Sequence, residues 1–166
     1  MDGSCRVVEA GPAREHYVPL LELADGSAQQ VRSYLHDGDL YVYREAGTEV
    51  GVVLVIPRDA GTVELKTVAV DATHQGRGVG RRMLRAVLDA LRLGGVSRVV
   101  VGTASSSIGP LAFYQKAGFR FLGIERDYFR EGRGYPRDLR EDGIPVRDMV
   151  WMDQWLAGIG PSTSSP

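Results

Sequence analysis

The stretch VELKTVAVDATHQGRGVGRRMLRAVLDALRL, residues 63–93, contains the features that decide the fold. Residues 63–70 are rich in β-branched side chains and predict a strand. The sequence QGRGVG at 75–80 follows four residues later, and its alternating glycines allow a tight backbone turn. Residues 79–93 repeat apolar side chains at helical spacing, with arginines on the other face. The stretch therefore predicts a strand, a glycine-rich loop and an amphipathic helix in immediate succession.

The glycine-rich loop has the properties of a phosphate-binding site. Its glycines let backbone N–H groups approach a ligand, and the first N–H groups of the following helix have no partner inside that helix. The helix dipole is positive at this end, and Arg77, Arg81 and Arg82 add positive charge. The alternative is a tight turn beside a solvated arginine face. The spacing G-x-G-x-G differs from the dinucleotide-binding G-x-G-x-x-G, because residue 81 is arginine.

The remaining pattern predicts one mixed α/β domain over residues 1–156, followed by a disordered tail at 157–166. A turn is expected at 57–61, a charged loop at 131–144, and a mobile N-terminus around Cys5. The other expected elements are helices at 13–24, 27–36 and 107–118, with Ser107 as N-cap, and strands at 40–43, 50–56, 98–101, 119–129 and 146–156.

Composition excludes several classes of protein. The chain has 166 residues, of which 43% are hydrophobic and 25% charged, as in ordinary soluble domains. A net charge of −1 argues against extended electrostatic binding of nucleic acid or anionic lipid. No apolar run approaches the roughly 20 residues of a membrane span, and no signal peptide is visible, so a cytoplasmic location is expected. Three separated histidines and one cysteine predict no metal site.

Two motifs resemble those of the GNAT superfamily of N-acetyltransferases. VAV at 68–70 followed by QGRGVG at 75–80 is similar to the family's Q/R-x-x-G-x-G/A motif. The segment 107–119 resembles N-x-x-A-x-x-x-Y-x-x-x-G-F, with Ser107 where the family often has asparagine and Pro110 where it often has alanine. The resemblance implies a central, mostly antiparallel twisted sheet flanked by helices. In that fold, the strand before the loop and the next strand splay apart.

The same resemblance implies acetyl-CoA as co-substrate. The amides of Gly76 to Arg81 would hold its pyrophosphate, and Gln75 would brace the loop. Main-chain groups of Val68 and Val70 would pair with the pantetheine arm, with the Val68 N–H directed at the thioester carbonyl. The cofactor-binding residues expected in this way are Val68, Val70, Gln75, Gly76, Arg77, Gly78, Val79, Gly80, Arg81 and Ser107.

Glu64 and Tyr114 are the candidate catalytic residues. Glu64 lies five residues before Ala69, where several family members carry a catalytic glutamate, and it could deprotonate the amine directly or through a water. Strand alternation places Glu64 on the same face as Val68 and Val70 unless a bulge intervenes. The alternative is an exposed glutamate paired with an arginine. Tyr114 could protonate the CoA sulfur, or could simply be a core tyrosine.

The resulting hypothesis is an N-acetyltransferase that moves an acetyl group from acetyl-CoA to a primary amine by direct attack in a ternary complex. The acceptor stays open among polyamines, amino acids, aminoglycoside-like compounds and protein amines. One alternative is a non-catalytic acyl-CoA-binding or sensing domain. Another is an interaction module whose final strands pair with a partner. A homodimer is compatible with all three hypotheses.

Overall fold

The computed structural model of the chain describes residues 3–156, so the tail expected at 157–166 lies outside the described residues. The strands are β1 (Gly3–Val8), β2 (Asp39–Glu45), β3 (Thr48–Asp59), β4 (Thr62–Val70), β5 (Arg98–Ala104), β6 (Arg120–Glu125), β7 (Arg140–Glu141), β8 (Ile144–Pro145) and β9 (Met149–Trp155). The helices are α1 (Val18–Asp25), α2 (Ala28–Tyr34), α3 (Val79–Leu93) and α4 (Ile108–Lys116), with 3-10 turns η1 (Pro12–Tyr17), η2 (Ala72–His74) and η3 (Glu131–Arg133). None of the helices described is long and apolar enough to span a membrane.

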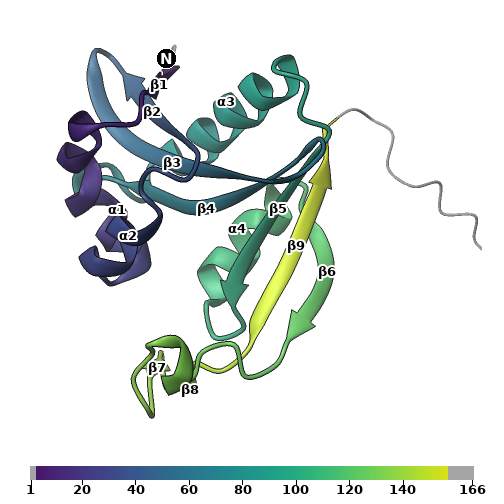
Figure 1. Cartoon of the computed structure of the whole chain (residues 1–166). Helices are drawn as coiled ribbons and strands as arrows, with labels where there is room; N and C mark the ends of the chain where they lie inside the picture. The colour runs from purple at the N-terminus through teal and green to yellow at the C-terminus, as the bar shows by residue number, and fades with distance from the viewer. Residues whose placement is uncertain (1–2, 157–166) are drawn as a thin grey trace, which may run out of the picture.

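Seven strands form one sheet in the order β1-β2-β3-β4-β5-β9-β6. Every neighbouring pair is antiparallel except β4 and β5, which run parallel. These two strands pair only where Thr62–Leu65 lies beside Arg98–Val101, and then they separate. Figure 1 shows the result: β1 to β4 and the group of β5, β9 and β6 diverge like the arms of a V. The predicted mostly antiparallel sheet with a splay beside the glycine-rich loop is confirmed.

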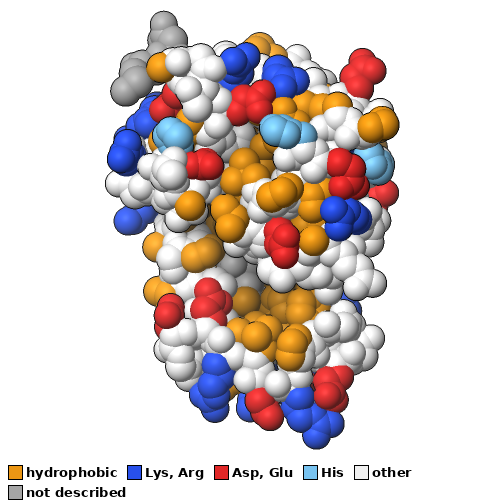
Figure 2. Space-filling view, turned by 90° about the vertical axis from the view of Figure 1, so that its left-hand side faces the viewer, with side chains coloured by type: hydrophobic (Ala, Val, Ile, Leu, Met, Phe, Trp, Pro, Cys, Tyr) orange, Lys and Arg blue, Asp and Glu red, His pale blue; other side chains and the backbone are white. Residues whose placement is uncertain are grey.

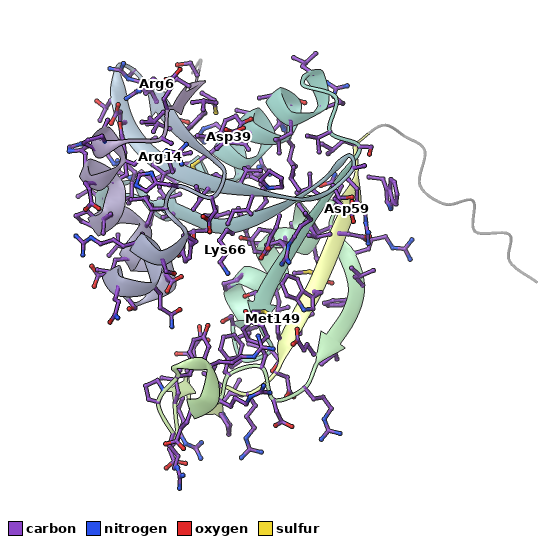
Figure 3. All side chains as sticks on the ribbon, viewed as in Figure 1. Arg6, Arg14, Asp39, Asp59, Lys66 and Met149 are labelled. Carbon is purple, nitrogen blue, oxygen red and sulfur yellow. The ribbon has the colours of Figure 1, made fainter. Side chains whose placement is uncertain are left out.

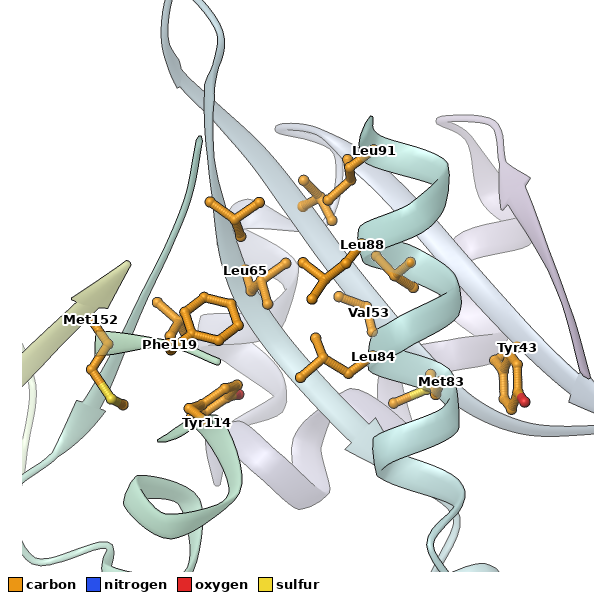
Figure 4. Close-up of a cluster of buried hydrophobic side chains, with 14 of the residues drawn as sticks. Tyr43, Val53, Leu65, Met83, Leu84, Leu88, Leu91, Tyr114, Phe119 and Met152 are labelled. Carbon is orange, nitrogen blue, oxygen red and sulfur yellow. The ribbon is translucent and has the colours of Figure 1, made fainter. Parts of the chain in front are cut away.

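Helix α3 covers one face of the sheet, as its apolar spacing predicts. Its buried residues are Val79, Met83, Leu84, Val87, Leu88 and Leu91. Figure 4 shows Leu84 and Leu88 directed from α3 toward Val53 of β3 and Leu65 of β4. Full burial of each such side chain contributes roughly 1.5–3 kcal/mol, so this stripe fixes the helix on the sheet.

The other face of β2 to β4 is covered by the N-terminal helices. Leu21 of α1 and Val31 of α2 pack with Leu40, Val42 and Leu54 of the strands. Because β2, β3 and β4 are buried on both faces, their sequences are nearly continuous apolar runs. The arm of the V that carries the glycine-rich loop is therefore held between two helical layers.

The N-terminal segment is a strand, and its expected mobility was wrong. β1 pairs along its whole length with β2, and Cys5 within it is partly buried. Only Val8 of this edge strand is fully buried, so the sequence lacks the alternation that reveals a strand. Arg14 holds the end of β1 in place: its Nε and Nη2 donate to the Val8 carbonyl oxygen at 3.0 and 2.9 Å. Its Nη1 donates to the Leu35 carbonyl oxygen at 2.7 Å, just past the end of α2.

Three other boundaries differ from the prediction. β3 continues through Pro57 to Asp59, so the turn expected from residue 57 is confined to Ala60 and Gly61. β6 ends at Glu125 instead of residue 129, and β9 begins at Met149 instead of residue 146. The chain between them forms η3 and the β7–β8 hairpin, where a plain charged loop was expected. Exposed polar residues in this region give no apolar pattern from which the hairpin or the strand ends could be predicted.

Replacing Arg14 by methionine should lower the free energy of unfolding by about 3 kcal/mol, because two buried carbonyl oxygens lose a charged donor. Urea denaturation at neutral pH measures the change. Arg32→Met is the matched control, since the Arg32 side chain is 56% exposed and bridges only Glu15. Equal loss of stability in the two variants would contradict the role given to Arg14.

Candidate active site

The edge of β4 is open beyond the point where β5 leaves it. Asp71, directly after β4, donates its N–H to the Val50 carbonyl oxygen of β3 at 2.9 Å. Backbone groups alternate in direction along a strand, so Ala69 also faces β3, whereas Val68 and Val70 face the open side. No strand of the described chain pairs with them there. The structure thus leaves main-chain groups of Val68 and Val70 directed into the gap.

The glycine-rich loop lies at the same end of β4 and is tied to it. Gln75 Nε2 donates to the Val70 carbonyl oxygen at 3.0 Å. Gly76 and Gly78 both have φ of 75°, which L side chains rarely adopt. Gly78 is the N-cap of α3 and supplies no side-chain cap, so the first N–H groups of the helix stay available to a ligand.

The three arginines around the loop are not equivalent. Arg82 Nε and Nη2 donate to the Glu45 carboxylate at 2.6 and 3.1 Å, and its Nη1 donates to the Arg77 carbonyl oxygen. The hydrogen bond from Arg82 holds the pKa of Glu45 below its ordinary value, so the pair is charged and structural. Arg77 and Arg81 form no ion pair within residues 3–156. Only these two supply uncompensated charge beside the helix start.

A bulge reverses the face on which Glu64 was expected. β3 residues Leu54 and Val55 are opposite Thr67 and Leu65, which leaves Lys66 without a partner. Leu65 therefore shares the α3 face with Val68 and Val70. Glu64 lies on the opposite face from Val68 and Val70, because the bulge that the prediction named as its exception is present.

The Glu64 side chain is almost fully enclosed yet lines a cleft. It is 6% exposed and forms an ion pair with Arg58 of β3. The predicted alternative was an exposed glutamate bound to an arginine; the arginine is present, but the carboxylate is buried. Buried ionised carboxylates require such a partner. Glu64 is therefore held in one place with its charge compensated.

The cleft is the space between the two arms of the V on the side of α1 and α2. Its volume is about 650 Å³, within the range of small-molecule sites. Its walls are the α1–α2 turn, Glu64 and Lys66 of β4, the end of β5, the aromatic segment 128–135 and the β7 residues Arg140 and Glu141. Figure 2 shows the hollow on this face, with hydrophobic side chains along its lower wall.

Ser107 contributes to the cleft and does not cap α4 through its side chain. Its Oγ donates to Glu141 Oε2 at 2.7 Å, and the buried Ser106 donates to the same oxygen at 3.1 Å. The sequence places Glu141 only within the charged loop at 131–144, and Ser106 is not among the predicted site residues. The run of three serines before α4 was the available signal, but it did not identify a partner 34 residues away.

Tyr114 lies on the other side of the gap. It is buried in the α3-side core, edge-on to Phe113 and Phe119 with ring centroids 5.1 and 5.6 Å apart. Burial raises the pKa of Tyr114 well above its ordinary value, so the phenol keeps its proton. Glu64 and Tyr114 thus lie on opposite faces of the sheet. No group of three or more His, Cys, Asp or Glu side chains in residues 3–156 could hold a metal ion.

The comparisons with known proteins agree with this architecture. The profile of the acetyltransferase (GNAT) family matches residues 12–119. The chain is 36% identical to the uncharacterized N-acetyltransferase YvbK of Bacillus subtilis (strain 168) over 131 residues, 79% of this chain and 83% of the relative.

Two solved structures are similar over nearly the whole chain. A Bacillus subtilis acetyltransferase in complex with CoA superposes with a TM-score of 0.80 at 32% identity, covering 92% of this chain and 97% of the other. A GNAT family acetyltransferase from Elizabethkingia anophelis with acetyl-CoA bound gives a TM-score of 0.79 at 31% identity, with the same coverage. With its splayed sheet, its glycine-rich loop at the start of α3 and these relatives, the chain belongs to the GNAT family of acetyltransferases.

Proposed function

We propose that this protein transfers an acetyl group from acetyl-CoA to the amino group of a small acceptor by direct attack in a ternary complex. The observation that carries the proposal is the open edge of β4. Main-chain groups of Val68 and Val70 face away from β3 beside the free N-terminus of α3, and no strand of the described chain pairs with them. A separate cleft reaches the same gap from the opposite face of the sheet. Two reactants can therefore meet at the edge of β4 from different sides.

The α3 side is suited to the co-substrate. The amides from Gly76 to Arg81 would bind the pyrophosphate, with Arg77 and Arg81 adding charge. The pantetheine arm would extend along the open edge of β4 as an added strand. The Val68 N–H would then donate to the thioester oxygen as it becomes an oxyanion, a donor worth a few kcal/mol when it is held in place beforehand.

The cleft side is suited to deprotonating the amine. Glu64 forms an ion pair with Arg58, and its carboxylate would accept a proton from the amine directly or through a water. The amine nitrogen attacks the carbonyl carbon, the C–S bond then breaks, and the departing thiolate takes a proton from Tyr114. The buried phenol retains that proton until it is needed.

Gly78→Asp should abolish acetyl-CoA binding, because it adds a strained side chain and a negative charge at the phosphate site. Calorimetric titration measures the loss. Gly143→Asp is the matched control, since Gly143 also has positive φ but lies in the turn between β7 and β8. Equal affinities of Gly78→Asp and the unaltered protein would rule out the loop as the pyrophosphate site.

Glu64→Gln should lower kcat by about 100-fold or more while acetyl-CoA affinity stays unchanged, because the base is lost but not the phosphate site. Thiol release measures turnover. Glu9→Gln, at an exposed residue after β1, should have no effect. Unchanged turnover in Glu64→Gln would remove Glu64 from the mechanism.

Intact acetyl-CoA binding with no turnover of any amine, in the unaltered protein, would instead favour the non-catalytic acyl-CoA-binding domain.

Tyr114→Phe should lower kcat more than KM, because only the departing thiolate needs the phenolic proton. Since burial raises the pKa of Tyr114, the unaltered enzyme should lose no activity through this group between about pH 7.5 and about pH 9.5. The pH profile of kcat tests the assignment. A fall in that interval which disappears in Tyr114→Phe would show that the phenol ionises there and is not protected by burial.

A further inference from the structure

We propose that the acceptor is an amino acid with an aromatic or other apolar side chain, and that Lys66 binds its carboxylate. This inference rests on the proposed function and names the substrate class of that site. It is carried by the partners that the charged groups of the cleft have and lack.

The three carboxylates that line the cleft already have donors. Glu64 is paired with Arg58. Asp25 accepts a hydrogen bond from Tyr34 at 2.5 Å, and Glu141 accepts from two serine hydroxyls. Each of these carboxylates therefore has a donor before any ligand arrives, and the donors to Asp25 and Glu141 are neutral hydroxyls.

The two cations of the cleft have no such partner. Within the described chain neither Lys66 nor Arg140 forms an ion pair, and Arg140 donates only to the Gly143 carbonyl oxygen. Lys66 is partly buried, and its Nζ lies 5.2 Å from the centroid of the Tyr34 ring. A cation–π contact offsets only part of the cost of removing an ammonium from water. An anionic group on the ligand would complete the site.

Lys66 lies on the same face of β4 as Glu64, and the bulge separates both from Val68 and Val70. Glu64 and Lys66 line the same cavity because alternate residues of a strand lie on the same face, and the bulge follows at Lys66 itself. Figure 3 shows Lys66 leaving β4 toward the gap between the two arms, with Met149 across from it. Two residues of a strand span roughly 7 Å, so the base and the cation are spaced for two groups on one small molecule.

The wall opposite β4 is aromatic and suits an apolar side chain. Tyr128, Phe129 and Tyr135 contact one another, with ring centroids 4.9 to 6.3 Å apart, and all three line the cleft. Gly102 of the same cleft lets the Trp151 ring pack closely over β5, because a Cβ there would lie 2.8 Å from that ring. The acceptor would place its amino group near Glu64, its carboxylate near Lys66 and its side chain against the aromatic rings.

Binding of product analogues tests the inference without requiring turnover. N-acetyl-L-phenylalanine and N-acetylphenethylamine differ only in the carboxylate, and each is titrated into the protein saturated with CoA. N-acetyl-L-phenylalanine should bind at least about tenfold more tightly than N-acetylphenethylamine, a gain typical of one charge-assisted contact. Lys66→Met should remove the difference, whereas Lys116→Met, on exposed α4 surface, should preserve it. Equal binding of the two compounds, no binding of either, or an unchanged difference in Lys66→Met would overturn the inference.

Turnover separates this inference from the function on which it rests. L-phenylalanine should be acetylated with a higher kcat/KM than phenethylamine, and Lys66→Met should narrow that ratio chiefly through KM. Equal turnover of the two amines would keep the acetyltransferase activity and overturn the amino acid as acceptor. Selective, Lys66-dependent binding of the carboxylate compound without thiol release from any amine would support the ligand class and overturn the proposed reaction.

Discussion

The parting of β4 and β5 is the constraint on which the other features depend. The two strands pair over four residues each, from Thr62 to Leu65 on β4, and then each stays paired with its other neighbour to its end. The gap is therefore held open by β3 on one side and β9 on the other. It exposes backbone groups in the middle of a sheet, where they would normally be bonded. A ligand that supplies an extra strand could satisfy them, which is the role proposed for the pantetheine arm of acetyl-CoA.

The bulge at Lys66 divides the chemistry between the two faces of the sheet. Before the bulge, Glu64 is directed into the cleft beside α1 and α2. After it, Val68 and Val70 share the α3 face with Leu65, beside the glycine-rich loop. A strand without the bulge would put the carboxylate and the loop on one face. In the proposed reaction, this one extra residue in β4 would let the amine and the thioester approach the same edge from opposite sides.

The strand, loop and helix at 63–93 could be predicted because their signals are local: β-branched residues, alternating glycines and an apolar helical stripe. The predicted α3 core face is buried as expected. The bulge could not be predicted, because it depends on the register with β3. The strand β1 was hidden by its exposed residues, and Arg14 by the usual solvation of arginine. The hydrogen bonds from Ser106 and Ser107 to Glu141 join segments far apart in the sequence, and no local pattern predicts them.

Hydrogen exchange at single amides of β4 tests the central claim most directly. Val68 N–H faces the gap and Ala69 N–H faces β3, so neighbouring residues serve as probe and internal control. The account predicts that saturating acetyl-CoA slows exchange at Val68 strongly and leaves Ala69 almost unchanged, because only the open edge gains a hydrogen-bond partner. Binding of acetyl-CoA that leaves exchange at Val68 unaltered would contradict the account, since the cofactor would then lie elsewhere than along this strand.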